Sequence, residues 1–193
     1  GSAYNYIAMK EAIKDSGLED KNVSNYPWWL FWRQRSELYH LIGRGDNFEK
    51  HPKNWNQDAK SFDKILVSCI VSKHLMFSFV PNDYIYSNAM NILRLYRYSD
   101  FSLLQSSIHA AFVWKHASRL ETRLRYSPSN VYLPFPKPDI DDSEQLNQLG
   151  KTYHQLRSDI MIDKQVGLTK LYNLFHDPGD TDNTVVEMRR LHE

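Results

Sequence analysis

The segment LLQSSIHAAFVWKHASRLETRLRYSPSNVYLPFPK, residues 103–137, decides how the rest of the chain is interpreted. Its first part has the apolar spacing of an amphipathic helix that Asp100 can cap, so we expect a helix over residues 101–116. Residues 119–126 then alternate as a short strand does, and prolines follow at 134, 136 and 138. Basic and aromatic side chains recur along the whole segment. We therefore expect it to present side chains to a partner while the remaining chain holds it in place.

The predicted helix has one face that we expect to lie in the core. Its residues recur at helical spacing and are Leu104, Ile108, Ala111, Phe112 and Lys115. His109 is expected to be a packed or hydrogen-bonded histidine. Metal ligation is disfavoured, because no second His or carboxylate pairs with it at a useful spacing.

The predicted strand would place two kinds of side chain on its two faces. Three would point inward: Leu120, Thr122 and Leu124. The other face would carry Arg119, Glu121, Arg123 and Arg125. Arg can bind guanine O6 and N7 together, and Glu accepts from cytosine N4, so this row has the chemistry of readout in the DNA major groove. An exposed strand with mutual Arg–Glu pairs is the alternative, and the pattern alone leaves both open.

The net charge of +1 conceals a gradient along the chain. Residues 1–20 carry −2, residues 21–137 carry +8 and residues 138–193 carry −5. A basic middle with an acidic tail indicates an anionic partner for the middle segment. An uneven surface charge without a partner is the alternative.

Length and composition narrow the class of protein. A chain of 193 residues, 41% of them apolar, fits one large domain or one domain with an appendage. No apolar run approaches the ~20 residues of a membrane span, and no secretory signal precedes the first predicted helix. The single cysteine, Cys69, lies in an apolar run and is expected to be buried, and one cysteine excludes an intramolecular disulfide. These features predict a cytoplasmic protein without a membrane partner.

Residues 4–62 predict two helices followed by a long polar loop. The first helix covers residues 4–16, and the second starts at Pro27, ends near Gly43 and precedes a loop over residues 44–62. An aromatic cluster in the second helix forms either a base-stacking platform or part of the core: Trp28, Trp29, Phe31 and Trp32. Arg33 and Arg35 lie on the polar side of this helix, where we expect them to reach phosphate.

Residues 64–95 have the chemistry of β-strands. Apolar or β-branched segments occur at 64–71, 75–80, 84–86 and 89–95, and Pro81-Asn82-Asp83 is a turn signal. Their close spacing predicts a small, mainly antiparallel meander. Lys73 and His74 lie in a connection between two of the strands, and we expect this connection to project side chains into a groove.

Residues 138–193 predict an acidic helical unit. Ser143 can cap a long helix from residue 144 to about residue 165, and a short helix over residues 168–176 follows Gly167. Capping-box spacing at residues 184–187 opens a last helix. Acidic helices bind phosphate poorly, so we expect this unit to pack against another part of the protein.

Several local patterns resemble the C-terminal half of the MmeI-like restriction–modification proteins, which are single-chain DNA adenine methyltransferases, often fused to a nuclease. The patterns occur in order over residues 26–193. They are WW (28–29), Arg35 with LY (38–39), VSK (71–73), FVP (79–81), LQSSIH (104–109), LRYSPS (124–129), PFP (134–136), GLTKLYN (167–173), HDP (176–178) and RLH (190–192). Together they resemble the family's target recognition domain followed by its helical C-terminal domain.

The resemblance implies a function for the basic segment. It implies that this region reads base edges of double-stranded DNA while the methyltransferase domain of the same parent chain flips out an adenine. It places base-reading positions at Glu121, Arg123 and Arg125, and a further one at Ala89, whose small side chain would leave room for a partner arginine. The expected backbone or groove contacts are Arg119, Lys73, His74, Arg33, Arg35, Lys115 and Tyr126.

The sequence also departs from that family. The glycine-rich S-adenosylmethionine motif and the Asn-Pro-Pro-Tyr motif of its methyltransferase half are absent, and no nuclease cluster of Asp, Glu and Lys is recognisable. We therefore expect S-adenosylmethionine to serve the parent enzyme. The chain itself is expected to be an excised piece of a prokaryotic protein. We expect it to hold no cofactor and to have no catalytic activity alone.

The predicted architecture is α+β, with a small, mainly antiparallel sheet flanked by helices and an all-α C-terminal subdomain after it. The predicted domains are residues 1–137 and 138–193. A helical protein-docking module without direct base readout is the alternative function. An enzyme in its own right is disfavoured, because the scattered histidines form no nucleophile–base–orienter set.

Overall fold

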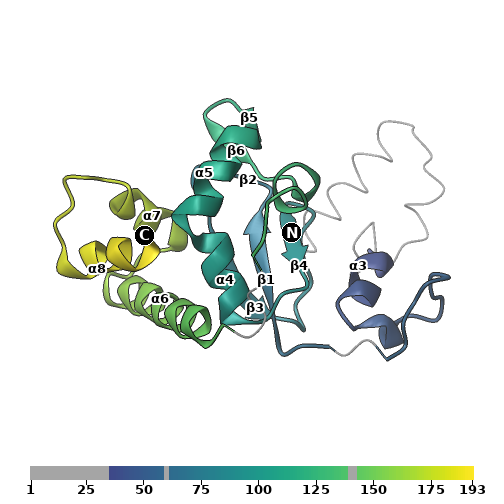
Figure 1. Cartoon of the computed structure of the whole chain (residues 1–193). Coiled ribbons are helices and arrows are strands. Elements are labelled where there is room, and N and C mark those ends of the chain that lie inside the picture. Colours follow the sequence, from purple (N-terminus) through teal and green to yellow (C-terminus); the bar gives the residue numbers. More distant parts are fainter. Residues whose placement is uncertain (1–34, 59–60, 139–142) are drawn as a thin grey trace, which may run out of the picture. The chain divides into compact units, whose positions relative to one another are not determined.

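The structure, a computed structural model, describes residues 35–58, 61–138 and 143–193 of the chain (Figure 1). The chain divides into two compact units, Gly1–Lys60 and Ser61–Glu193, and each is described by itself. The Trp-rich cluster at residues 28–32 and Arg33 lie outside the described residues, so their predicted roles stay predictions. The boundary predicted between residues 137 and 138 also stays a prediction.

The described part of the first unit is a short helix followed by an aromatic turn. Helix α3 (Ser36–Leu41) precedes the 3-10 turn η1 (Gly45–Asn47), and Gly43 between them has a φ of 80°, which favours glycine. His40 bonds to His51 at 2.8 Å between ring nitrogens, and Trp55 stacks on His51. A Cβ at Gly45 would lie 2.4 Å from Trp55 Nε1, so the rings close tightly over this glycine.

The first sheet of the second unit forms the centre of the core. Its order is β3-β1-β4, with β3 (Phe77–Pro81) and β4 (Met90–Leu93) both antiparallel to β1 (Lys64–Cys69). Four successive residues of β1 are buried, as expected of a strand covered on both faces. Cys69, at its end, is exposed, so the prediction that it is buried is wrong. The antiparallel pairing is confirmed, although the order is not that of a meander.

Residues 84–86 do not form the predicted strand. The segment is irregular, and the Tyr86 hydroxyl donates to the Pro81 carbonyl oxygen at 3.1 Å. Tyr86 is buried, whereas Tyr84 and Ile85 are exposed. Tyr86 therefore anchors this segment, which is a loop, and Asn82 of the turn is bonded to Asp63 and Ser61.

The second sheet contains the predicted recognition segment. Its order is β2-β6-β5, with β2 (Val71–Ser72), β5 (Ser118–Leu120) and β6 (Arg123–Arg125) all antiparallel. The continuous strand predicted over residues 119–126 is therefore wrong: the chain reverses at Glu121 and Thr122 to make a hairpin. Sequence patterning missed it because this turn contains no Gly, Asn or Pro.

Three hydrogen bonds connect the junction between β1 and β2, the β4 region and the end of β6. The N–H of Ile70, between β1 and β2, donates to the Ala89 carbonyl at 2.9 Å, and the Ile70 carbonyl accepts from the Tyr126 N–H at 2.7 Å. The buried side chain of Asn91 in β4 donates through Nδ2 to the Tyr126 carbonyl at 3.1 Å. The residue that follows β6 is thus fixed to the first sheet.

Two helices cover the sheets where one was predicted. α4 (Tyr98–Gln105) ends at Ser106, whose side chain accepts from His109 N and so caps α5 (Ser107–His116). This break rotates the buried face: Val113 and His109 are buried, but Ile108 is 73% exposed and the side chain of Lys115 is exposed. The predicted core face of this segment is therefore wrong for α5, because the periodicity was counted through a break.

His109 is a core histidine, as predicted. Its Nδ1 donates to the Leu104 carbonyl at 2.7 Å, and its ring packs near Phe77 and Tyr126. Desolvation lowers its pKa to about 4, so the ring is neutral at neutral pH. The π-helical turn η2 (Pro128–Tyr132) and the proline-rich segment then close this side of the core, where Phe135 lies against His109.

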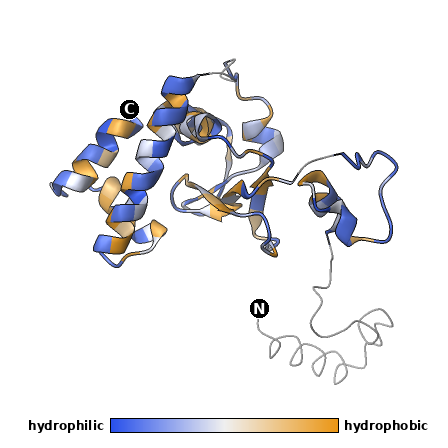
Figure 2. Ribbon diagram, turned by 90° about the horizontal axis from the view of Figure 1, so that it is seen from below, coloured by the Kyte–Doolittle hydropathy of each residue, from blue (hydrophilic) through white to orange (hydrophobic). Residues whose placement is uncertain are grey.

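Three helices end the chain: α6 (Glu144–Asp163), α7 (Leu168–Phe175) and α8 (Asn183–His192). Ser143 caps α6 as predicted, whereas α8 is capped by Asp182, ahead of the predicted capping box. Hydrophobic and hydrophilic residues alternate along these helices, as Figure 2 shows. Helix α6 lies close against α4, since a Cβ at Gly150 would be 2.2 Å from the Tyr98 carbonyl. The guanidinium of Arg157 is buried and donates to the Phe77 carbonyl at 2.7 Å.

The predicted α+β class is confirmed by this arrangement. Helix α6 packs on α4 and reaches β3, and buried residues of α6, α7 and α8 join the core cluster of the second unit, so the acidic tail shares its core with the sheets. Among the described residues, no helix is both long and apolar enough to cross a membrane.

Candidate nucleic-acid interface

The register of the β5–β6 hairpin decides which side chains share a face. Leu120 lies opposite Arg123, and Ser118 lies opposite Arg125. Directly opposite residues of an antiparallel pair project to the same side, and successive residues of a strand alternate. Ser118, Leu120, Arg123 and Arg125 therefore form one face, which we call the hairpin face. Leu124, which is buried, projects to the other side and into the core.

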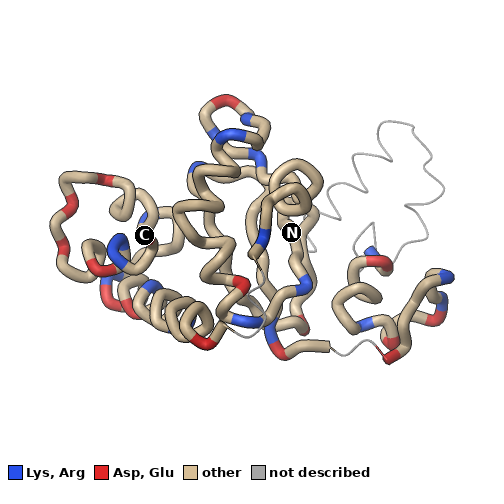
Figure 3. The backbone as a smooth tube through the Cα atoms, viewed as in Figure 1, with Lys and Arg blue, Asp and Glu red and all other residues tan. Residues whose placement is uncertain are grey.

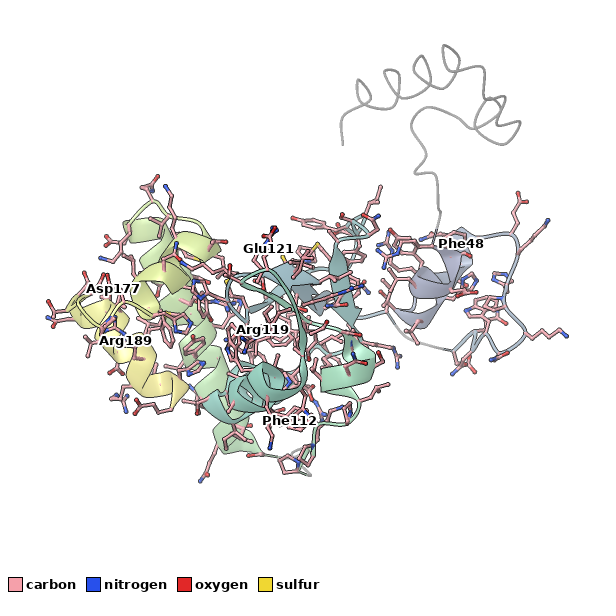
Figure 4. All side chains as sticks on the ribbon, turned by 90° about the horizontal axis from the view of Figure 1, so that it is seen from above. Phe48, Phe112, Arg119, Glu121, Asp177 and Arg189 are labelled. Carbon is pink, nitrogen blue, oxygen red and sulfur yellow. The ribbon has the colours of Figure 1, made fainter. Side chains whose placement is uncertain are left out.

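Arg119 leaves the row in which the sequence placed it. It lies opposite Leu124 in the ladder and hence on the side away from the hairpin face. Its guanidinium lies over the ring of Trp114 in α5, 5.5 Å from the centroid, in a cation–π contact. The sequence therefore predicted the exposure of Arg119 but not its orientation, and Figure 4 marks it beside the hairpin turn.

Glu121 occupies the hairpin turn in a left-handed backbone conformation, with φ of 58°. Its side chain is 74% exposed and accepts a hydrogen bond from Arg123 Nη2 at 3.0 Å. This contact is the Arg–Glu pair that the alternative interpretation expects. An exposed pair of this kind adds little stability, so both groups can be given up to another partner at small cost.

Cations around the hairpin outnumber the acids. Figure 3 shows Lys and Arg gathered near β5 and β6, with acidic colouring at the hairpin turn, whereas acidic residues are common along the C-terminal helices. In the described ranges no carboxylate lies within ion-pair distance of Lys73, Lys115, Arg119 or Arg125. Elsewhere, Lys164 pairs with Asp182 and Arg190 with Glu187. The surface around β5 and β6 therefore carries positive charge that no carboxylate in the described part of the chain neutralises, as the charge gradient predicted.

Lys73 and His74 are held by one residue of α7. The Lys73 ammonium and His74 Nε2 both donate to Asn173 Oδ1, at 2.7 and 2.9 Å. Lys73 remains exposed, but His74 is buried and stacks on His176 at 4.6 Å between centroids. His74 was predicted to reach DNA, and the structure instead places its ring under the C-terminal helices.

A cavity of ≈ 360 Å³ opens beside these residues. Its walls come from the β2–β3 connection, α5, the hairpin turn and the last two helices, and include Lys73, His74, Trp114, Thr122, His176 and His192. Burial and nearby positive charge lower the pKa of His176 to about 4, so its ring is neutral at neutral pH. Despite its three histidines, no group of three or more metal-ligating side chains suited to an ion occurs among the described residues.

Three further residues that were predicted to contact DNA lie in environments that differ from one another. Tyr126 is 1% exposed and its pKa is raised by burial, so the predicted DNA contact of its side chain is corrected to a core role. Ala89 is exposed, and its carbonyl accepts from Ile70, beside the strand pair that carries Arg125. Arg35 is half-buried with a φ of 49° before α3, in the first unit.

Sequence reasoning missed Leu120 and Asn173. Leu120 was assigned to the core by strict alternation, and its 50% exposure follows from the turn that the pattern did not reveal. Asn173 lies within the GLTKLYN segment, 99 residues beyond His74, so only the folded chain brings it to the β2–β3 connection. A lone Asn in a helix gave no signal of this role.

Comparisons with known proteins agree with this arrangement. The chain is similar over 80% of its length to the solved structure titled "Structure of Type IIL restriction-modification enzyme MmeI in complex with DNA has implications for engineering of new specificities", with a TM-score of 0.53 and 22% identity. The chain spans 22% of the length of that protein, and at this identity the likeness supports the fold alone. No curated protein sequence matches the chain.

A family model gives the more direct assignment. The model described as "MmeI, target recognition domain" matches residues 42–139, which include both sheets, α4, α5 and the hairpin. This match covers 98 of the 193 residues. The chain therefore belongs to the family of MmeI target recognition domains.

Proposed function

We propose that this chain is the DNA-specificity module of a restriction–modification enzyme and that its β5–β6 hairpin reads base edges in the major groove. The observation that carries the proposal is the hairpin face, where Arg123 and Arg125 are both exposed beside the carboxylate of Glu121. Membership in a target recognition family supports the same role.

The hairpin offers exposed donors and an exposed acceptor for this task. A two-stranded ribbon fits the major groove of B-DNA, which is ≈ 12 Å wide. Arg123 and Arg125 are offered to guanine O6 and N7, and Glu121 to the amino group of cytosine. The Arg123–Glu121 contact would then be exchanged for contacts with bases, which costs little because both partners are exposed.

Ala89 has a supporting role in this proposal. Ile70 links it to the hairpin, because the Ile70 N–H donates to the Ala89 carbonyl and the Ile70 carbonyl accepts from the N–H of Tyr126, the residue after Arg125. Its methyl group leaves space in which the longer side chain of Arg125 can reach a base. A larger residue at position 89 would occupy that space and alter the base pair that is read.

The remaining cations would position the duplex rather than read it. Lys73, Lys115 and Arg119 lie near the hairpin without acidic partners in the described ranges, as phosphate contacts require. Arg33 and Arg35 belong to the first unit and are proposed for phosphate on sequence grounds. His74 would act indirectly, because its buried ring shares Asn173 with Lys73.

We further propose that the parent protein methylates adenine N6 with S-adenosylmethionine, with or without an attached endonuclease. The sequence supplies neither a glycine-rich cofactor motif nor an Asn-Pro-Pro-Tyr motif, so the cofactor and the flipped adenine belong to a methyltransferase domain outside this chain. The chain would then be a non-catalytic part of a cytoplasmic prokaryotic enzyme, with duplex DNA and that domain as its partners.

A docking role for the C-terminal helices is the second candidate function. Ile162 in α6 and Val186 in α8 are large apolar side chains with high exposure, which a partner domain could cover. The two roles are compatible, because the docking surface lies on the helices and the cations lie on the hairpin side.

The test of the proposed function is duplex binding by the intact protein over a range of salt concentrations. Phosphate contacts release counterions, so log K should fall linearly with log salt, by about 0.9 for each contact. Lys73→Ala should weaken binding to all duplexes alike and reduce the slope by about one contact. Lys170→Ala, at an exposed position of α7, serves as the matched control and should leave the slope unchanged. Binding that is insensitive to salt would overturn the proposal.

A further inference from the structure

Leu120 is an exposed apolar side chain within a set of polar ones. It is 50% exposed, at the end of β5, and its neighbours Arg119 and Glu121 are both charged. A single exposed leucine is common and needs no explanation on its own. Its position in the strand pair suggests a function, however. Leu120 is directly opposite Arg123 and so shares the hairpin face with both proposed base-reading arginines.

The core does not account for this side chain. Leu124, on the opposite side of the hairpin, is fully buried and supplies the apolar contact between the hairpin and the core. β5 is the outer strand of its sheet, and all three of its residues are exposed. The exposed half of Leu120 therefore remains available to a partner that approaches the hairpin face.

We propose that Leu120 is a specificity-determining residue that takes the C5 methyl group of a pyrimidine in the major groove. The inference rests on the proposed function. Thymine displays this methyl group on its major-groove edge, and apolar side chains are what recognise it there. 5-Methylcytosine displays the same group at the same carbon.

The hairpin places this contact next to the base that Arg123 reads. Side chains directly opposite in an antiparallel pair have Cβ atoms about 5 Å apart, whereas successive base pairs are about 3.4 Å apart along the helix axis. Leu120 and Arg123 therefore reach the same or adjacent base pairs. The arginine supplies hydrogen bonds to one, and the leucine supplies apolar contact to a methyl group.

The experiment measures binding of the intact protein to its selected target duplex, in which each thymine is replaced in turn by deoxyuridine. This replacement removes only the C5 methyl group. The wild type should lose affinity about fourfold at one thymine, as expected for one buried methyl group. Leu120→Ala should bind the thymine and deoxyuridine duplexes equally at that position. Ile108→Ala, an exposed apolar position on α5, is the matched control and should keep the wild-type sensitivity.

A second arm replaces each cytosine of the target by 5-methylcytosine. If the contacted pyrimidine is cytosine, the wild type should gain about fourfold at one position and Leu120→Ala should not. The inference is overturned if the wild type responds to neither replacement at any position, if Leu120→Ala keeps the response, or if Leu120→Ala weakens all duplexes equally. If Arg123→Ala still loses base preference in those cases, the proposed function stands without this inference. If the wild type selects no sequence, the proposed function itself fails.

Discussion

Glu121 connects the stability of the hairpin with its proposed role. A non-glycine residue with φ of 58° is strained by contact between its Cβ and its own backbone, and glycine avoids this strain. Strained residues of this kind cluster at functional sites, where their side chains are needed. The presence of Glu rather than Gly at the turn is thus in keeping with a carboxylate retained for binding.

Replacement of Glu121 by Gly separates these two effects. We expect the free energy of unfolding to rise by up to about 1 kcal/mol, because the strain is relieved while only an exposed ion pair is lost. Base preference at one position should weaken at the same time. Urea unfolding and duplex selection measure the two quantities, and a variant that is less stable but equally selective would contradict this account of the turn.

His109 makes the stability of the fold depend on pH. Its pKa is about 4 in the folded chain, against 6.5 for an unperturbed histidine, because burial disfavours the charged ring. The unfolded chain therefore takes up a proton between pH 6.5 and 4 that the folded chain does not. The stabilisation is complete above pH 6.5 and is lost as the pH falls towards 4. His154 and His176 are shifted in the same direction, also to about 4.

Unfolding free energies measured at several pH values test this dependence. The wild type should become less stable on acidification from pH 7 to 4, by on the order of 3 kcal/mol for His109 alone. His109→Asn, which retains a donor for the Leu104 carbonyl, should start from a lower stability and lose less of it over the same range. A pH dependence identical to that of the wild type would mean that His109 is not the titrating group.

At the scale of elements, patterning succeeded where no local break interrupted the segment. The strands at residues 64–69 and 90–93 and the long helix α6 with its Ser143 cap were predicted within a few residues. Patterning failed at two local breaks. Ser106 ends one helix and caps the next, and Glu121 reverses the chain with a side chain that sequence rules do not associate with turns.

These two breaks explain some of the errors at the candidate site. Once the chain reverses at Glu121, the alternation of residues 119–125 no longer describes one strand, and Arg119 and Leu120 exchange faces. The orientations of Arg119 and Leu120 thus depend on a turn that the pattern of apolar residues did not reveal. The DNA contact predicted for Tyr126 was wrong for another reason: alternation with Leu124 already places its side chain inward, where Ile70 and Asn91 bind its backbone.

The packing of α6 on α4 depends on Gly150. A Cβ there would lie 2.2 Å from the Tyr98 carbonyl and 2.5 Å from Ser102 Oγ, so Gly150→Ala must push the helices apart. We expect a loss of about 1–3 kcal/mol in the free energy of unfolding, as for other overpacked sites. Gly167→Ala is the matched control, because nothing lies within 4 Å of its Cβ position, and it should change stability by less than about 0.5 kcal/mol. Equal stability of the two variants would contradict the close helix contact.

At the scale of the whole molecule, the acidic tail and the basic segment share one core. Arg157 of α6 reaches the Phe77 carbonyl in β3, and Asn173 of α7 holds Lys73. Within residues 61–193 the basic and the acidic stretches therefore form two surfaces of one folded unit, and the difference in their charge could be predicted because counting charges requires no structure. How the tail packs could not be predicted, since polar contacts such as these join residues 80 and 100 positions apart.

The central claim is that the hairpin face reads bases, and selection from a randomised duplex library tests it most directly. The intact protein should be compared as wild type, Arg123→Ala and Arg190→Ala, the last removing an equally charged, exposed side chain from α8. The account predicts that Arg123→Ala loses preference at one base pair, worth about 1–3 kcal/mol there, while Arg190→Ala selects the wild-type sequence. An Arg123→Ala variant with the wild-type preference at every position, or with equal loss on all sequences, would contradict it.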